Sequence, residues 1–489
     1  MTGPRPAASA GPRVPARRSV VVIGGGLAGI TAAVALSEAG VSVTLLEARP
    51  RLGGATCSFS RDGLIVDNGQ HVFLRCCTAY LGLLARLGMA GSVALQDRFD
   101  VTVLSPGGRA RLRRTGLPGP LHMGAALAGY RHLSYAQRLR AARAALAMTA
   151  LNPDRGDLDT TRLGDWLAAR GQDERIRRVL WDLFTVSSLN VPGDDANLAL
   201  AATVVKTALL GARDAADIGV PAIPLGDLHG RAAAALLTRL GAQVRLGAKA
   251  AAVSLRPGRP GGNGSGRRLR VQLAERRGAG DGPTAIDADG VVLAVPPETA
   301  ARLMPADAPA SHPGPAQWRE LATSPIVNVH VIYDRRVTRL PFAAAVDSPV
   351  QWVFDRTGPS GLRAGQYLAI SLSAADSYVD VPASALRDQF LPALAELFPA
   401  AGGARVTDFF VTRERRATIR QVPGCERLRP PAATAVPGLV LAGAWTDTGW
   451  PDTMEGAVRS GLNAVRALRH DLAVAASGRP APADARVPA

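Results

Sequence analysis

Residues 19–54 constrain the fold of this chain more than any other stretch, and they are SVVVIGGGLAGITAAVALSEAGVSVTLLEARPRLGG. The run at 20–23 is short, apolar and β-branched, which is typical of a buried parallel strand. The Ala-rich stretch at 27–39 has no proline and predicts a helix, and a second strand is predicted at 41–46, with Glu47 at its end. This order of strand, helix and strand predicts an α/β unit with a parallel sheet.

Three glycines between the first strand and the helix follow the spacing Gly-x-Gly-x-x-Gly. Gly24 permits a tight turn, Gly26 lets the backbone approach a pyrophosphate, and Gly29 lets the helix pack closely on the strand. The helix starts at Leu27 and Ala28, where free N–H groups and the positive end of the helix dipole favour phosphate. The turn therefore predicts a dinucleotide site in a Rossmann-like domain.

An acid and a second glycine pair extend this predicted site. Glu47 follows Gly29 by 18 residues, where a carboxylate accepts hydrogen bonds from a ribose and disfavours the 2′-phosphate of NADP. Arg51 precedes Gly53 and Gly54; the glycines permit close backbone approach, and a guanidinium can pair with a phosphate. An ordinary glycine turn with a solvated arginine is the alternative for this second motif.

Two other interpretations of the N-terminal region are disfavoured. Arg17 and Arg18 precede an uncharged run to Ser37, as in a twin-arginine export signal, but glycines interrupt the run and no small-residue cleavage site follows it cleanly. The same glycines weaken a run that is close to the minimum length for a membrane span. By composition, residues 1–18 and 473–489 are predicted to be a disordered arm and a disordered tail.

The composition fits a folded enzyme-sized protein without a metal site. The chain has 489 residues, enough for two or three domains, with 47% hydrophobic and 20% charged residues. Its net charge of +17 comes almost entirely from arginine, and no aromatic-interleaved basic patch indicates a nucleic-acid partner. There is no Cys-x-x-Cys or His-x-x-x-His pair, which gives no metal motif and suits a reducing cytoplasm. The four cysteines are Cys57, Cys76, Cys77 and Cys425.

Two inner segments are unusual. Residues 64–74, LIVDNGQHVFL, predict a strand and a turn whose polar residues form a partly buried polar site or a satisfied turn. Residues 117–150 are rich in Leu, Ala and Met with interspersed arginines, and predict either an interfacial membrane segment or a surface helix. The polar residues of the first are Asp67, Asn68, Gln70 and His71, and the arginines of the second are Arg131, Arg138, Arg140 and Arg143.

The middle of the chain predicts helices followed by an antiparallel sheet. Helices are predicted within 161–210, a loop at 215–224, a helix at 226–240 and a strand region at 243–255. Within that strand region GAKAAAVSL resembles a return to the nucleotide domain, and we include Val253 among the cofactor-binding residues. A flexible hairpin tip is predicted at 257–268, and strands at 325–333, 350–355, 366–373 and 406–412, the last followed by a basic stretch at 413–420.

The C-terminal stretch 438–468 predicts a second strand–turn–helix unit. A strand at 439–442 leads into Gly443, a turn rich in Gly, Trp and Thr follows, and a helix is predicted from Thr453 to Leu468. Such a unit can hold phosphate or ribityl groups, although a plain terminal helix docked on the sheet is the alternative. Two such sites at opposite ends of one chain suit FAD better than a diffusible NAD.

With both ends described, the chain resembles the flavin amine oxidase and carotene desaturase superfamily, and within it the hydroxysqualene dehydroxylase group. The superfamily motifs are Gly24, Gly26, Gly29, Glu47, Arg51, Gly53, Gly54, Gly443 and Met454-Glu455-Gly456-Ala457. The group motifs are Asp67-Asn68-Gly69-Gln70-His71, Ser188-Leu189-Asn190, PIVNVH at 325–330, Gln351-Trp352-Val353-Phe354, Trp445-Thr446 and Gly449-Trp450-Pro451. One departure is Ala444, where many relatives have Asp, so binding there would depend on backbone N–H groups and Asp447.

The resemblance implies an α/β fold: a Rossmann-like FAD-binding domain (19–75, 215–300 and 425–472) and a discontinuous α+β substrate domain (76–214 and 301–424), as in amine oxidases. It also implies FAD-dependent reduction of hydroxysqualene to squalene in hopanoid or related triterpene synthesis. The partner would be a long apolar isoprenoid, with the electron donor open, in the cytoplasm or at the inner face of the membrane. His71 is the first candidate for the proton donor and Asp447 the second. The alternatives are a phytoene-type desaturase, an amine oxidase and a non-catalytic flavin-bound scaffold.

Overall fold

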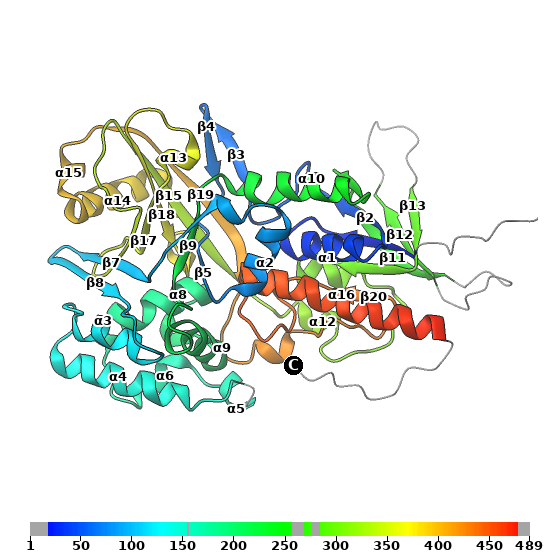
Figure 1. The fold of residues 1–489 in the computed structure, drawn as a ribbon, viewed down its shortest axis with the longest axis horizontal. Coiled ribbons are helices and arrows are strands. Elements are labelled where there is room, and N and C mark those ends of the chain that lie inside the picture. Colours follow the sequence, from blue (N-terminus) through cyan, green and yellow to red (C-terminus); the bar gives the residue numbers. More distant parts are fainter. Residues whose placement is uncertain (1–17, 154–155, 257–267, 275–283, 478–489) are drawn as a thin grey trace, which may run out of the picture.

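The computed structural model describes residues 18–153, 156–256, 268–274 and 284–477. Most of the predicted arm at 1–18, of the hairpin tip at 257–268 and of the tail at 473–489 lies outside the described residues. The two main parts of the molecule lie side by side in Figure 1, one around α1 and α16 and the other around β15 and β18. None of the helices in the described ranges combines the length and the apolar character that crossing a bilayer requires.

A five-stranded parallel sheet forms the centre of the first part. Its strand order is β10 (Gln243–Leu246), β2 (Ser42–Glu47), β1 (Ser19–Ile23), β14 (Gly290–Leu293) and β20 (Leu439–Leu441). Val20 and Val22 pack into one hydrophobic cluster and Val21 and Ile23 into another, because side chains alternate between the faces of a strand. The sheet is therefore buried on both faces, as its continuous apolar strands predict.

Helices cover one face of this sheet and a smaller sheet covers the other. Helices α1 (Leu27–Glu38), α10 (Ala232–Arg239) and α16 (Met454–Ser477) contribute to the cluster on the helical face. Figure 1 shows α1 and α16 running side by side. The opposite face carries the antiparallel sheet β11 (Ala250–Arg256), β12 (Arg268–Leu273) and β13 (Ala285–Ala288). The chain thus forms three layers around the predicted nucleotide unit.

The second part contains a seven-stranded, mainly antiparallel sheet and two groups of helices. Helices α14 (Ala383–Leu397) and α15 (Pro399–Gly402) belong to the upper left of Figure 1, and α3 to α9 to the lower left. The strand order is β19 (Val406–Ile419), β15 (Thr323–Tyr333), β18 (Gln366–Leu372), β17 (Trp352–Asp355), β16 (Phe342–Ala345), β7 (Asp100–Ser105) and β8 (Gly108–Arg113). The lower helices include α3 (Gly124–Ala128), α4 (Tyr135–Thr149), α6 (Leu163–Ala168), α8 (Asp182–Leu189) and α9 (Leu198–Val204).

Four local predictions were wrong. The predicted loop at 215–224 contains β9 (Ile218–Pro221), which lies between β5 (Phe73–Leu74) and β6 (Val93–Leu95) in a small sheet. The strand region at 243–255 is two strands in two sheets, because Gly247 between them adopts a φ of +64°. Strand β19 continues through the basic stretch to Ile419, paired with β15. Helix α16 runs past the predicted end at Leu468 to Ser477.

The remaining elements connect these layers. The hairpin β3 (Ser58–Arg61) and β4 (Leu64–Asp67) leads into α2 (Thr78–Arg86) through β5. The other short helices are α5 (Gly156–Asp159), α7 (Glu174–Ile176), α11 (Pro297–Leu303), α12 (Pro315–Trp318) and α13 (Thr357–Ser360).

Candidate active site

The glycine turn between β1 and α1 is tightly packed against its neighbours. Gly24 adopts a φ of +110°, and a Cβ at this position would collide with the carbonyl of Ala294. A Cβ at Gly29 would collide with the carbonyl of Gly24, so the helix can lie this close to the strand only with glycine there. These two glycines therefore have the roles that the spacing predicted, and the first turn of α1 keeps its N–H groups free of a side-chain cap.

The second glycine pair contacts the first. Gly53 donates its N–H to Gly25 O at 2.8 Å, and a Cβ at Gly54 would lie 2.8 Å from the Cα of Gly26. Arg51 is half-buried beside this contact and donates from Nη1 to Gly54 O at 3.3 Å. The two predicted motifs are thus parts of one backbone cradle.

Glu47 lies at the end of β2 next to the same cradle. Its Oε2 accepts the Gly25 N–H at 2.7 Å and its Oε1 accepts the Arg49 N–H at 2.8 Å. Each carboxylate oxygen has more than one acceptor position, so both can still accept from ribose hydroxyls. Val253 lies on β11, buried between the two sheets, and the turn before β11 reaches Glu47 through the bond from Ala248 N to Glu47 O at 2.8 Å.

The C-terminal unit adjoins this cradle. Gly443 adopts a φ of +143° and donates its N–H to Ser460 Oγ on α16 at 2.9 Å. Where α16 crosses α1, a Cβ at Gly461 would collide with the carbonyl of Ala28. Strands β1 and β20 are both parallel to β14, so their carboxyl ends meet at one edge of the sheet. The two sites predicted at opposite ends of the sequence therefore come together, and their close-packed glycine backbone fits a dinucleotide.

An apolar cavity of about 210 Å³ lies next to the C-terminal turn. Residues from both parts of the molecule line it, and Met454, the first residue of α16, is one of them. Four of its six aromatic residues are only 1–8% exposed, so much of the wall consists of buried rings. The aromatic lining consists of Phe73, Phe99, Phe184, Trp352, Phe354 and Trp450.

Residues 27–469 match the model of the family described as flavin containing amine oxidoreductase. The chain belongs to this family. It is a flavin-dependent oxidoreductase with FAD as its cofactor. We propose that the cradle described above holds this FAD.

Relatives with assigned activities include isoprenoid enzymes. The chain is 29% identical over 453 residues to hydroxysqualene dehydroxylase of Rhodopseudomonas palustris, covering 91% of this chain and 97% of the relative. It is 25% identical over 518 residues to the zeta-carotene desaturase of Zea mays, covering 94% and 84% respectively. Among solved structures, cyclohexylamine oxidase from Brevibacterium oxydans has a TM-score of 0.68 at 20% identity, covering 94% of this chain and all 100% of that one, which shows a shared fold.

The two predicted proton donors of this flavoprotein do not line the cavity. His71 is half-buried, and its Nδ1 lies 3.2 Å from Gly69 O, which it can reach only by donating an N–H. Burial lowers the pKa of His71, so the ring is neutral near pH 7 and a poorer proton donor than the sequence predicted. Asp447 is exposed, and its Oδ1 accepts the Gly449 N–H at 3.3 Å.

The cavity instead presents an amide donor. Gln70 Nε2 is buried in the cavity wall and has no hydrogen-bond partner within the described part of the chain. A buried N–H without a partner is costly, which indicates that a ligand atom completes it. Glu455 also lines the cavity, but its oxygens accept from Tyr80 N at 2.8 Å and Arg459 Nε at 2.7 Å. The polar motif at 67–71 had indicated Gln70 only as one of four residues.

Arg429 is a site residue that sequence patterns did not indicate. It is 3% exposed, and its guanidinium donates to the carbonyls of Ala444 at 2.9 Å, Thr446 at 2.7 Å and Trp450 at 2.8 Å. Glu426 balances its charge at 2.7 Å. Arg429 therefore fixes the turn after Gly443, including the backbone of Ala444.

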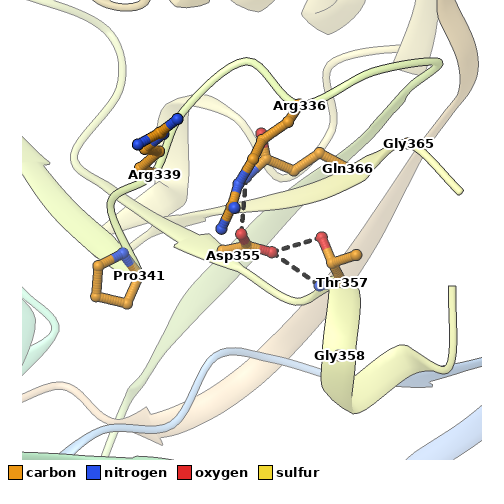
Figure 2. Close-up of a pocket in the computed structure, with 8 residues that line it drawn as sticks. All are labelled: Arg336, Arg339, Pro341, Asp355, Thr357, Gly358, Gly365 and Gln366. Carbon is orange, nitrogen blue, oxygen red and sulfur yellow. Dashed lines mark hydrogen bonds between the residues drawn. The ribbon is translucent and has the colours of Figure 1, made fainter. Parts of the chain in front are cut away.

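A larger, polar pocket of about 520 Å³ lies elsewhere, at the loops of the second part (Figure 2). Its central polar groups bond to one another: Gln366 Nε2 donates to Asp355 Oδ2 at 2.7 Å, and Thr357 Oγ1 donates to Asp355 Oδ1 at 2.5 Å. Because these groups are already paired and the pocket is polar, we assign the substrate site to the smaller apolar cavity.

Proposed function

We propose that this flavoprotein reduces hydroxysqualene to squalene. The observation that carries the proposal is an apolar, aromatic-lined cavity with one unpartnered amide donor, Gln70 Nε2, beside the C-terminal turn of the cofactor cradle. The similarity to hydroxysqualene dehydroxylases over 91% of the chain and 97% of the relative supports the same substrate.

The proposed chemistry suits these residues. The hydroxyl of the substrate is allylic, so its departure leaves a delocalised cation. When bound, reduced FAD supplies the hydride that forms the new C–H bond. The C–O bond breaks, and the oxygen takes up one proton and leaves as water; the balance is met because FADH2 would give up two hydrogens in becoming FAD, one as the hydride and one as this proton. The Gln70 N–H donates a hydrogen bond to that oxygen as charge develops on it. The stacked rings of Trp352 and Phe354, 6.3 Å apart, offer aromatic faces to the cation, and the apolar lining disfavours water beside it.

A phytoene-type desaturase is the second candidate, because the zeta-carotene desaturase of Zea mays is similar over 94% of this chain. One experiment separates the two. The holoenzyme is reduced under anaerobic conditions and mixed with hydroxysqualene, while the oxidised holoenzyme is mixed with phytoene. We expect squalene and reoxidised flavin from the first mixture and no new double bonds in the second. Desaturated phytoene without squalene would replace the proposal with the second candidate, and an inert flavin in both mixtures would support a scaffold.

A further inference from the structure

The segment from 101 to 153 has an unusual charge pattern. It contains eight arginines and no Asp or Glu. Four of these arginines pair with carboxylates from outside the segment: two in β8, Arg114 directly after it, and Arg140 on α4. Arg131 and Arg143 are exposed and have no carboxylate partner in the described ranges, and Arg138 donates only to the carbonyls of Leu133 and Ala128. The surface of this segment is therefore locally cationic.

The same surface carries apolar side chains that face solvent. On α4, Tyr135, Leu139 and Leu146 are 84%, 54% and 57% exposed, and their spacing places them along one side of the helix. Leu117 and Leu121, 52% and 62% exposed, precede α3. Scattered exposed leucines are ordinary, but these residues make up five of the nine large apolar side chains that are exposed in the described parts of the chain. We call Leu117, Leu121, Tyr135, Leu139 and Leu146 the outer apolar face.

The opposite side of α4 packs toward the cavity. Ala144 and Met148 belong to one buried cluster with Val204, the last residue of α9, and Leu209 from the helical turn Val205–Leu210 packs against that cluster. Val204 and Leu209 are also part of the cavity wall. In Figure 1, α3 and α4 lie at the outer edge of the lower helices, on the side away from α1. One layer of helices thus separates the outer apolar face from the cavity.

We propose that the outer apolar face docks on the surface of an anionic lipid bilayer, with Arg131, Arg138 and Arg143 near the headgroups. Apolar side chains inserted at the acyl boundary and cations at the phosphates are the two contributions that hold interfacial helices on membranes. The arrangement orients the helical wall of the cavity toward the phase in which a long isoprenoid dissolves. The orientation of the cavity wall toward this phase matters only if the proposed function is right, whereas the docking itself does not rest on the proposed function.

The test uses the full-length holoenzyme and sedimentation with vesicles. We expect binding to vesicles of phosphatidylcholine with phosphatidylglycerol, weaker binding to phosphatidylcholine alone, and a decrease with added salt. Leu139→Glu/Leu146→Glu should weaken binding at least about tenfold, because two buried apolar contacts are lost. Leu246→Glu is the matched control: Leu246 is 39% exposed on β10, in the other part of the molecule, and its variant should bind as the wild type does.

Several outcomes would overturn the docking. These are wild-type protein that stays in the supernatant with the mixed vesicles, a double variant that binds as well as wild type, and equal loss in the Leu246 variant. A concentration-dependent dimer that the double variant abolishes, without vesicle binding, would assign this face to a second copy of the chain. Flavin absorbance and circular dichroism of the double variant verify its fold. Turnover of detergent-dispersed hydroxysqualene tests the proposed function separately, since it needs no vesicle.

Discussion

At the scale of single residues, the unpartnered amide of Gln70 is the sharpest probe of the cavity. Gln70→Leu keeps the approximate shape and removes the donor, so we expect normal FAD content and a turnover lowered about tenfold, the value of one hydrogen bond made in the transition state. Ser187→Ala is the control, because this hydroxyl of the same wall already donates to Leu183 O at 2.8 Å. Turnover of the Gln70 variant at the wild-type rate would remove Gln70 from the mechanism.

The ion pair of Asp67 and Arg356 joins the cofactor part to the second sheet. Its atoms lie 2.7 Å apart, and the side chains are 4% and 6% exposed. Arg356→Met leaves a buried carboxylate unpaired, so the free energy of unfolding should fall by about 3–5 kcal/mol in urea titrations. Arg270→Met breaks the Arg270–Asp287 pair, which has the similar separation of 2.6 Å but is exposed to solvent, so it should lower the free energy of unfolding far less than Arg356→Met does. Equal losses in the two variants would contradict this account.

At the scale of elements, Arg429 determines whether the turn after β20 keeps its shape. Arg429→Lys retains the charge but cannot make three carbonyl contacts with one planar fork, so FAD affinity should fall about tenfold or more. Retention of flavin on desalting and titration of the apoprotein measure this. Arg427→Lys, at an exposed position two residues away, should leave the affinity unchanged. A fall in apoprotein melting temperature without any change in FAD affinity would make Arg429 a purely structural residue.

An element could be predicted from the sequence where the residues that determine it are close together in the chain. The unit from β1 to β2 was predicted correctly, because strand, glycine turn and helix are all encoded within 19–47. Strand β9 was missed, since Gly219 and Pro221 are typical of loops and only pairing with the distant β5 and β6 makes them a strand. The same holds for the candidate site. Elements distant in the sequence bury His71 and so lower its pKa, and the local sequence pattern could not indicate this.

At the scale of the whole molecule, buried histidines predict how stability depends on pH. Burial lowers the pKa of His229 and of His330 from the ordinary value of 6.5 to about 3. The unfolded chain therefore binds more protons than the folded chain below pH 6.5, so this stability is present above 6.5 and is lost as pH falls toward 3. The contribution of each histidine to the free energy of unfolding, measured by urea titrations below pH 6.5, should decrease by about 1.4 kcal/mol per pH unit.

His330 offers the variant that tests this slope. Its ring nitrogens lie 2.6 Å from Tyr367 Oη and 2.9 Å from Thr412 Oγ1, and the ring stacks on Phe410. His330→Gln should be less stable than the wild type at every pH. The slope of its free energy of unfolding against pH should be smaller, because one titrating group has been removed. If the free energy of unfolding of His330→Gln changed with pH between 7 and 5 as steeply as that of the wild type, His330 would not titrate as described.

The five-stranded sheet has a consequence for synthesis on the ribosome. Its central strand β1 is synthesised long before β20 and α16, because these elements lie far downstream in the chain. Pairings between such distant segments form slowly, because a long loop must close first. The nascent polypeptide therefore carries an incomplete nucleotide unit, with apolar strand edges open, until β20 and α16 have been synthesised. Open strand edges and exposed apolar surface are prone to aggregation, so this interval is the vulnerable stage of synthesis.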